Sequence, residues 1–268
     1  MIANTRFSDE VSVIAFYGID PSPEAIRCFY LQALNWFEAL GYPIDMMAVE
    51  GPGFSGNYRT FKRTHPKLQK AGFSSITSFS LAALLPDGKF PLFDFLIDIA
   101  CITDNKPVAY IAVNSSLLRL PSETMSRMAD SAIACLKPIY GIGYRRSRQD
   151  GPTLYVVGIG QGIGPSSGQA YEEAVRHGHW GLLGMDRQVY RDGVLRDVYP
   201  WNFLTASHLT TQVNNRVLQD WIQQDEQRGH LKSLNDDVWL WEVDEENRLA
   251  VRSILWNAGI IFNWKNYL

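Results

Sequence analysis

The sequence has few cysteines, no long hydrophobic run and no large excess of charge of either sign. Its 268 residues include 25 basic and 28 acidic side chains, which gives a formal net charge of −3. Proteins that bind nucleic acid by bulk electrostatics need a basic face, so this balance argues against nucleic acid as a partner. Hydrophobic residues make up 46% of the chain, enough for a core without disulfides or a structural metal. The composition is that of an ordinary globular protein.

The cysteines and the apolar segments predict the cellular compartment of the protein. Cys28, Cys101 and Cys135 are far apart and odd in number, and none has a second cysteine or a histidine at ligand spacing. We interpret them as buried thiols in a reducing compartment. Residues 1–10 contain no apolar segment of the kind found in secretory signals, and residues 90–102 are too few to span a membrane. We therefore expect a cytoplasmic protein that does not bind membranes.

The first half of the chain predicts helices and antiparallel strands. Residues 11–17 are β-branched and aromatic, as in a buried strand, and Ser22 is a natural helix N-cap before Pro23. A helix with one apolar face runs from there to Gly41, and a second begins at Ser122. Three strands separated by turn residues lie between these helices, at 75–85, 92–102 and 108–115.

The second half predicts the same kinds of element in a less regular order. We expect a strand at 154–159, a helix near 170–177, a helix from Leu209 to Ile222 that stops before Gly229, and a closing hairpin of 238–243 and 248–255. No linker rich in Pro, Gly or Ser separates the halves. We expect a single α+β unit over residues 1–268, with helices on one face of an antiparallel sheet. Two similar lobes that meet near 145–151 are the alternative.

Four glycines between residues 158 and 164 follow the predicted strand, but their spacing does not fit a dinucleotide-binding fingerprint. Counting from Gly158, the sixth position is Ile163, and counting from Gly160 it is Pro165, where a glycine is required. The run can still form an anion-binding nest of backbone N–H groups. We expect no cofactor.

Few residues could support acid–base or metal chemistry. His177 and His179 diverge on a helix and lack an acidic companion, so we expect no metal site. Asp94 and Asp98 have the even spacing that places both on one face of a strand, where two buried carboxylates can act as acid and base. The simpler interpretation is that they mark its solvent face. No hydrolase, kinase or oxidoreductase signature is present, which favours a protein without enzymatic activity.

Two segments combine aromatic residues, arginines and glycines, namely residues 140–146 (YGIGYRR) and 191–204 (RDGVLRDVYPWNFL). Tyr, Trp and Arg dominate binding energy at protein interfaces because they bury a large area and keep a polar group. The candidate partner-binding residues are Tyr140, Tyr144, Arg145, Arg146, Arg196, Asp197, Tyr199 and Trp201. The alternative is that the aromatic side chains of 199–203 alternate into the core while Arg196 and Asp197 form an ion pair.

The end of the chain resembles immunity proteins of bacterial type VI secretion. Over about the last quarter, the resemblance is carried by the order of Trp201, Phe203, Leu204, Leu209, Ala258 and Gly259. It implies a non-enzymatic inhibitor that binds a cognate protein toxin in the cytoplasm and blocks the active site of that toxin.

Two other functions remain open. The first is an enzyme or small-anion-binding protein with a site near the glycine run 158–164 and Arg145, Arg146 and Arg196, because arginines beside glycine-rich backbone hold phosphate or carboxylate groups. The second is a self-assembling component of a phage or toxin cluster, and a homodimer is open in either case. A basic segment at residues 59–70, expected as an exposed loop and short helix, makes the exclusion of nucleic acid less firm there.

Overall fold

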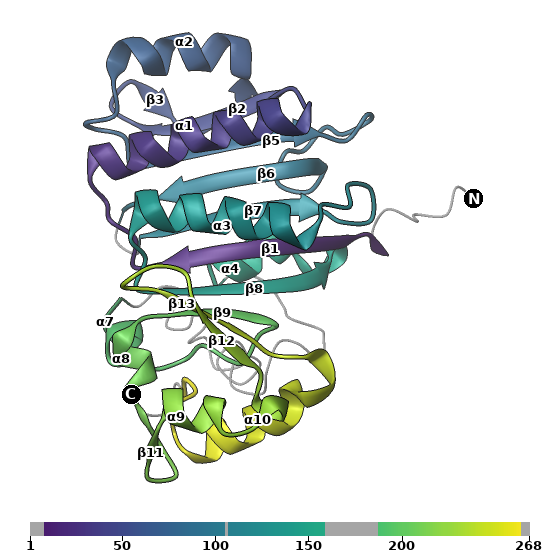
Figure 1. The fold of residues 1–268 in the computed structure, drawn as a ribbon. Coiled ribbons are helices and arrows are strands. Elements are labelled where there is room, and N and C mark those ends of the chain that lie inside the picture. Colours follow the sequence, from purple (N-terminus) through teal and green to yellow (C-terminus); the bar gives the residue numbers. More distant parts are fainter. Residues whose placement is uncertain (1–7, 105–106, 159–186, 264–268) are drawn as a thin grey trace. The chain divides into compact units, whose positions relative to one another are not determined.

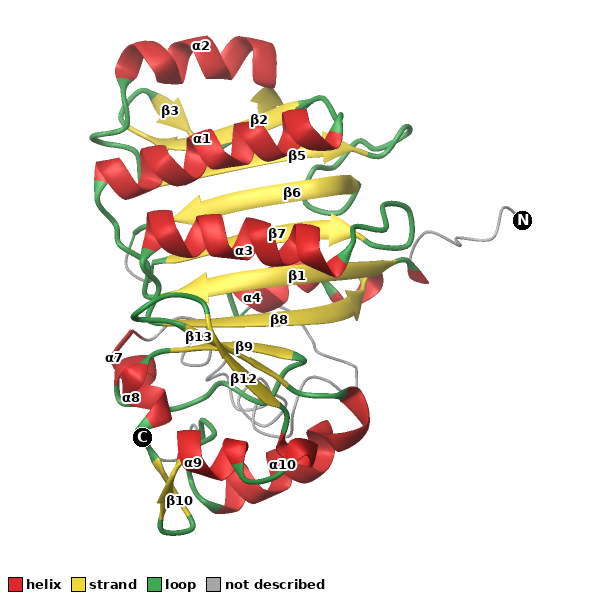
Figure 2. Ribbon diagram, viewed as in Figure 1, coloured by secondary structure: helices red, strands yellow, loops and turns green. Residues whose placement is uncertain are grey.

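The computed structural model describes residues 8–104, 107–158 and 187–263, and it has a mixed α+β fold (Figures 1 and 2). The predicted fold class is therefore confirmed. The chain divides into two compact units, and the division falls within β1 (Glu10–Tyr17) and β8 (Tyr140–Ser147). The first unit comprises Met1–Ile14, Ile19–Pro138 and Arg145–Thr153, and the second comprises Ala15–Gly18, Ile139–Tyr144 and Leu154–Leu268.

The first unit is built on one sheet. Its strands follow the order β1, β7 (Val108–Asn114), β6 (Phe95–Ile102), β5 (Ser78–Leu84) and β2 (Met46–Gly51). β5, β6 and β7 form the predicted antiparallel meander, in which Ile99 lies between Leu81 and Ile111. The short strands β3 (Phe54–Ser55) and β4 (Arg59–Thr60) pair with β2 and lead into α2 (Phe61–Ala71).

Two of the predicted helices, α1 (Pro23–Leu40) and α3 (Ser122–Leu136), cover one face of this sheet (Figure 2). Ser22 caps α1 as expected, since its hydroxyl accepts a hydrogen bond from the backbone N–H of Ala25 at 3.3 Å. Gly41 ends α1 with a φ of 75°, a conformation that glycine adopts without strain. The apolar face of α1 packs on the sheet through Phe29, whose ring centroid lies 6.0 Å from that of Phe79.

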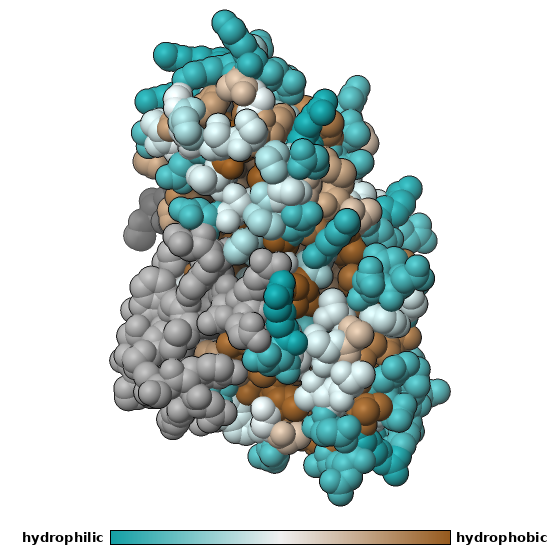
Figure 3. Space-filling model, turned by 90° about the vertical axis from the view of Figure 1, so that its left-hand side faces the viewer, coloured by the Kyte–Doolittle hydropathy of each residue, from teal (hydrophilic) through white to brown (hydrophobic). Residues whose placement is uncertain are grey.

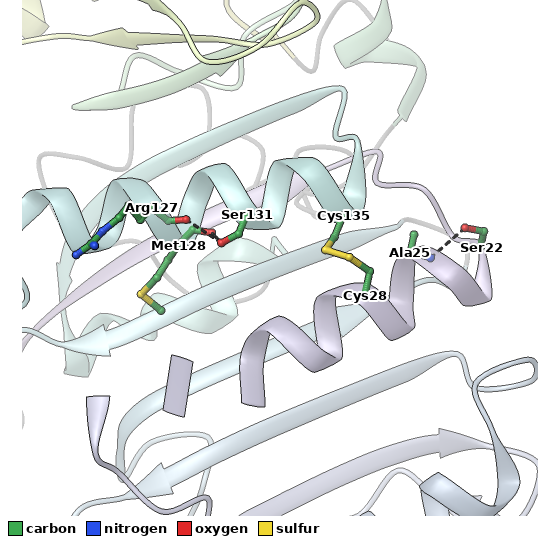
Figure 4. The surroundings of a disulfide bond; sticks show 7 residues. All are labelled: Ser22, Ala25, Cys28, Arg127, Met128, Ser131 and Cys135. Carbon is green, nitrogen blue, oxygen red and sulfur yellow. Dashed lines mark hydrogen bonds between the residues drawn. A yellow bond between two sulfur atoms is a disulfide. The ribbon is translucent and has the colours of Figure 1, made fainter. Parts of the chain in front are cut away.

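The prediction that all three cysteines are reduced is wrong. Cys28 on α1 and Cys135 on α3 form a disulfide (Figure 4). Cys101 in β6 is a free and buried thiol. The two bonded cysteines are 107 positions apart in the sequence, and only the packing of both helices on one sheet face brings their Cα atoms within 5.5 Å. Disulfides persist in oxidising compartments, so this bond also argues against the reducing environment inferred from the cysteines.

The second unit combines short strands with short helices. Antiparallel pairs join β12 (His230–Ser233), β13 (Trp239–Glu242), β9 (Trp201–Leu204) and β8 in that order. Its helices are α7 (Arg187–Arg191), α8 (Ala206–Leu209), α9 (Leu218–Gln223) and α10 (Glu245–Asn257), with a small hairpin of β10 (Gln212–Val213) and β11 (Arg216–Val217). None of the described helices in either unit is both long and apolar enough to cross a membrane.

Three element predictions for the second half are wrong, while the strand at 238–243 is confirmed as β13. The strand expected at 154–159 is replaced by helix α4 (Pro152–Val156). The helix expected from 209 to 222 is interrupted by β10 and β11, because Asn214 and Asn215 form a tight turn with φ values of 50° and 65°. Residues 248–255 lie in α10, which buries Val251 and Leu255, four positions apart. The helix expected near 170–177 lies outside the described residues.

Candidate functional site

The two aromatic segments singled out from the sequence pair with each other in the second unit. Gly141 and Gly143 of β8 lie opposite Phe203 and Trp201 of β9. A Cβ atom at Gly141 would lie 2.8 Å from Cδ1 of Phe16, and one at Gly143 would lie 2.9 Å from Cβ of Trp201. The glycines are therefore required for close packing between the strands, because a side chain at either position would collide with a neighbouring aromatic residue.

Arg196 lies among buried tyrosines, which we call the tyrosine cluster. Its Nη1 donates hydrogen bonds to the hydroxyl of Tyr17 at 2.6 Å and to the carbonyl of Val156 at 3.2 Å. Its Nη2 donates to the carbonyl of Tyr155 at 2.6 Å, and the guanidinium carbon lies 4.2 Å from the ring centroid of Tyr155. These hydrogen bonds and the aromatic face stabilise a positive charge away from water. The tyrosine cluster consists of Tyr17, Tyr140, Tyr144, Tyr155, Tyr190 and Tyr199.

The tyrosines of the cluster also contact one another. The ring centroids of Tyr140 and Tyr190 are 4.8 Å apart, and the hydroxyls of Tyr155 and Tyr199 are 2.6 Å apart. Burial raises the pKa values of Tyr140 and Tyr199 well above their usual value. The cluster is a packed wall of aromatic rings around one arginine.

Asp197 and Arg196 contact different partners. Its Oδ1 lies 2.7 Å from Nε of Arg252 on α10, and it also accepts the backbone N–H of Val198 at 2.8 Å. Burial raises the pKa of Asp197, while the charge of Arg252 opposes this effect. The contact ties α10 to the segment that precedes β9.

Six of the eight predicted partner-binding residues are buried. Their exposed fractions lie between 1% and 5% for Tyr140, Tyr144, Arg146, Arg196, Asp197 and Tyr199. Arg145 is exposed and Trp201 is half-buried. The buried six can stiffen the protein beneath a binding surface but do not offer their side chains to a partner in this conformation. Binding of a partner by Arg145 or Trp201 stays a prediction.

An exposed apolar loop between β5 and β6 was missed in the sequence, where residues 92–94 were assigned to the strand. The loop exposes 67% of Phe90, 43% of Leu92 and 45% of Phe93. Asp94 holds the loop in place, since its Oδ2 accepts the backbone N–H groups of residues 89 and 90 at 2.9 and 3.1 Å. Its Oδ1 pairs with Nη2 of Arg148 at 2.7 Å. Large apolar side chains gathered on an ordered loop are typical of protein contact sites.

Asp98, the second carboxylate of the predicted pair, has entirely different surroundings. It is fully buried in β6 and accepts hydrogen bonds from the hydroxyls of Ser80 at 2.9 Å and Tyr110 at 2.7 Å. Burial raises the pKa of Asp98 to about 6, and the two hydrogen bonds limit this rise. The interpretation of both carboxylates as solvent-facing is therefore wrong for Asp98, and the two belong to separate hydrogen-bond networks.

The alternative site at the glycine run falls mostly outside the described residues, as do His177 and His179. Only Gly158 is described, at the end of α4 with a φ of 74°. Of the three arginines assigned to that site, only Arg145 is exposed. Across residues 8–104, 107–158 and 187–263, no three His, Cys, Asp or Glu side chains gather to hold a metal ion. An anion site near the glycines stays a prediction.

No protein-family model matches the sequence, and no curated protein does. Among solved structures, the chain is similar to the T6SS (type VI secretion system) protein PA0821 of Pseudomonas aeruginosa, with a TM-score of 0.58 and 12% identity over 95% of this chain and 73% of that one. A chain in the crystal structure of the toxic C-terminal tip of CdiA from Pseudomonas aeruginosa in complex with immune protein gives a TM-score of only 0.27, with 13% identity over 53% of this chain and 90% of that one. The second score is too low to establish a common fold. The first match extends along nearly the whole chain, which therefore shares its fold with a T6SS protein.

Proposed function

We propose that the chain is a non-enzymatic immunity protein that binds a cognate bacterial toxin and neutralises it. The observation that carries the proposal is the fold shared with a T6SS protein over 95% of the chain. The resemblance to immunity proteins between Trp201 and Gly259 supports it from the sequence alone. A toxin inhibitor of this kind works by occupying a surface, so it needs no catalytic residues of its own.

The exposed apolar loop is the proposed contact surface for the toxin. Phe90, Leu92 and Phe93 are large apolar side chains that a partner can bury, and Asp94 fixes the loop before binding. Fixing a loop in advance lowers the conformational entropy lost on association. We also propose contacts through Arg145 and Trp201, the two accessible members of the set predicted from the sequence.

We propose that the protein acts in an oxidising compartment such as the bacterial periplasm, in place of the cytoplasm expected from the sequence. The support is the disulfide between Cys28 and Cys135. Reducing systems in the cytoplasm keep most thiols free, whereas a disulfide that joins two helices persists outside it.

Co-expression with the product of the neighbouring gene tests the proposal. Cells that express this product as a toxin should grow only when the intact chain is present in the same compartment. A Phe90→Asp/Phe93→Asp variant should lose protection, and Leu249→Asp, which changes an equally exposed apolar residue on α10, should keep it. Failure of the intact chain to restore growth would reject the proposed function. Protection by the double variant would reject only the loop as the contact.

A further inference from the structure

A second surface of the first unit has a different chemistry. A pocket of about 430 Å³ lies between α2 and the turn that joins β2 to β3. We call it the basic pocket, and its polar and aromatic lining includes Phe54, Asn57, Arg59, Arg63, Thr64 and Lys67. Hydrophilic residues dominate the surface over α2, at the top of the view in Figure 3.

The charged residues that line the basic pocket, Arg59, Arg63 and Lys67, are all cations. The carboxylate of Glu50 lies next to Gly56 in the turn. Residues 51–86 contain five lysines and arginines and no aspartate or glutamate, although the whole chain has a net charge of −3. Arg59 and Arg63 are exposed, and neither forms an ion pair within the described part of the chain. The three lining cations outnumber the neighbouring carboxylate of Glu50, so the pocket keeps a positive potential that favours an anionic ligand.

Contacts within the protein hold the basic pocket in shape. Nζ of Lys67 donates a hydrogen bond to the carbonyl of Gly53 and lies 4.7 Å from the ring centroid of Phe54. These two contacts hold the turn against α2. Arg63 lies four positions before Lys67, so both side chains project from one face of the helix toward the same pocket.

The position of these cations is unfavourable for the helix itself. Lys62 and Arg63 stand in the first turn of α2, which contains no acidic residue. The helix dipole places partial positive charge at this end, so the two cations are repelled there. The helix thus carries its cations where they reduce its own stability, and an anionic group in the pocket would offset that repulsion.

We infer that the basic pocket binds carboxylate groups of an acidic segment on a protein partner. This inference rests on the proposed function and assigns the chemistry of one part of the toxin surface. Guanidinium groups bind carboxylates through two parallel hydrogen bonds, and a concave pocket of this size accommodates one or two acidic side chains. A single nucleic-acid strand needs a longer cationic track and free aromatic faces for stacking, whereas the ring of Phe54 already faces the ammonium group of Lys67.

The test is binding of a fluorescein-labelled peptide of eight glutamates to the full chain, followed by fluorescence anisotropy in 150 mM NaCl. We expect Arg59→Glu/Arg63→Glu to weaken binding at least tenfold. The matched control is Arg27→Glu/Arg127→Glu, which reverses the charge of two exposed arginines on α1 and α3 of the same unit. Its dissociation constant for the peptide should stay within twofold of the value for the unmodified chain. Thermal unfolding of each variant verifies that it is folded.

Three results would overturn the inference. These are no binding by the unmodified chain, an equal loss in both double variants, and tighter binding of a labelled eight-nucleotide thymidine strand than of the peptide. The last result would assign the pocket to nucleic acid. Because the peptide assay contains no toxin, its failure leaves the growth test of the proposed function unaffected, and failure of the growth test leaves the peptide result standing.

Discussion

His208 is a buried histidine whose neutral form fits its surroundings. Its Nδ1 accepts the backbone N–H of Thr205 at 3.3 Å, and its ring stacks on Tyr140 with 5.2 Å between centroids. Its Nε2 has no hydrogen-bond partner in the described structure, so protonation would place a charge in a site that cannot stabilise it. Burial accordingly lowers the pKa of His208 to about 3.

The low pKa makes stability depend on pH. The unfolded chain, in which a histidine has a pKa near 6.5, binds a proton more readily than the folded chain, so the free energy of unfolding falls as pH drops from about 6.5 toward 3. When the pH falls from 7.5 to 5.0, we expect His208 alone to lower the free energy of unfolding by about 2 kcal/mol. Urea unfolding should show this loss in the intact chain and not in His208→Phe. Equal losses in both proteins would contradict the assignment.

At the scale of elements, the contact between β8 and β9 depends on residues without side chains. Gly141→Ala would push a methyl group against the ring of Phe16 and the carbonyl of Ala15, both less than 3.1 Å away. We expect a loss of about 1–3 kcal/mol in the free energy of unfolding, as for other overpacked cores. Arg145→Ala, on the same strand but exposed, should change it by less than about 0.5 kcal/mol. If denaturant unfolding gave the same loss in the free energy of unfolding for both variants, it would contradict this packing.

The link between α1 and α3 makes a second prediction at this scale. The Cys28–Cys135 disulfide closes a loop of 107 positions, and reducing it should lower the free energy of unfolding by about 3–5 kcal/mol. Thermal unfolding with and without reductant measures the effect. Cys101→Ser should remain just as sensitive to reductant, because Cys101 is the free thiol. Titration of three reactive thiols in the denatured, unreduced chain would show that the bond is absent.

At the scale of the whole molecule, β1, α1, the meander of β5, β6 and β7, and α3 could be predicted because their signals are local, whereas β2, β3 and β4 were missed. Ser22, Pro23 and Gly41 mark the ends of α1 within the chain itself, and a Pro-Asp-Gly turn separates β5 from β6. Each of these elements is long enough for the regular spacing of its hydrophobic residues to identify it as a helix or a strand. The disulfide could not be found in this way, because it depends on how two helices pack.

The second half was less predictable because its elements are short and their ends depend on single residues. Asn214 and Asn215 turn the chain where apolar spacing favoured a continuous helix. Six of the eight candidate partner-binding residues are buried for a related reason. The aromatic residues of 140–146 and 191–204 resembled a binding surface because the sequence does not reveal that β8 and β9 pair with each other. Conversely, residues 92–94 of the exposed apolar loop resembled part of a strand because Leu92 and Phe93 are apolar.

We predict that the protein neutralises its toxin by binding to the toxin surface, without altering the toxin chemically. Isothermal titration calorimetry of the purified chain against the product of the neighbouring gene tests this most directly, with the intact mass of that product measured after the complex is dissociated in denaturant. We predict a complex of fixed stoichiometry from which the toxin is recovered chemically unchanged. No heat of binding, or a toxin altered in mass by substoichiometric amounts of the chain, would contradict neutralisation by binding.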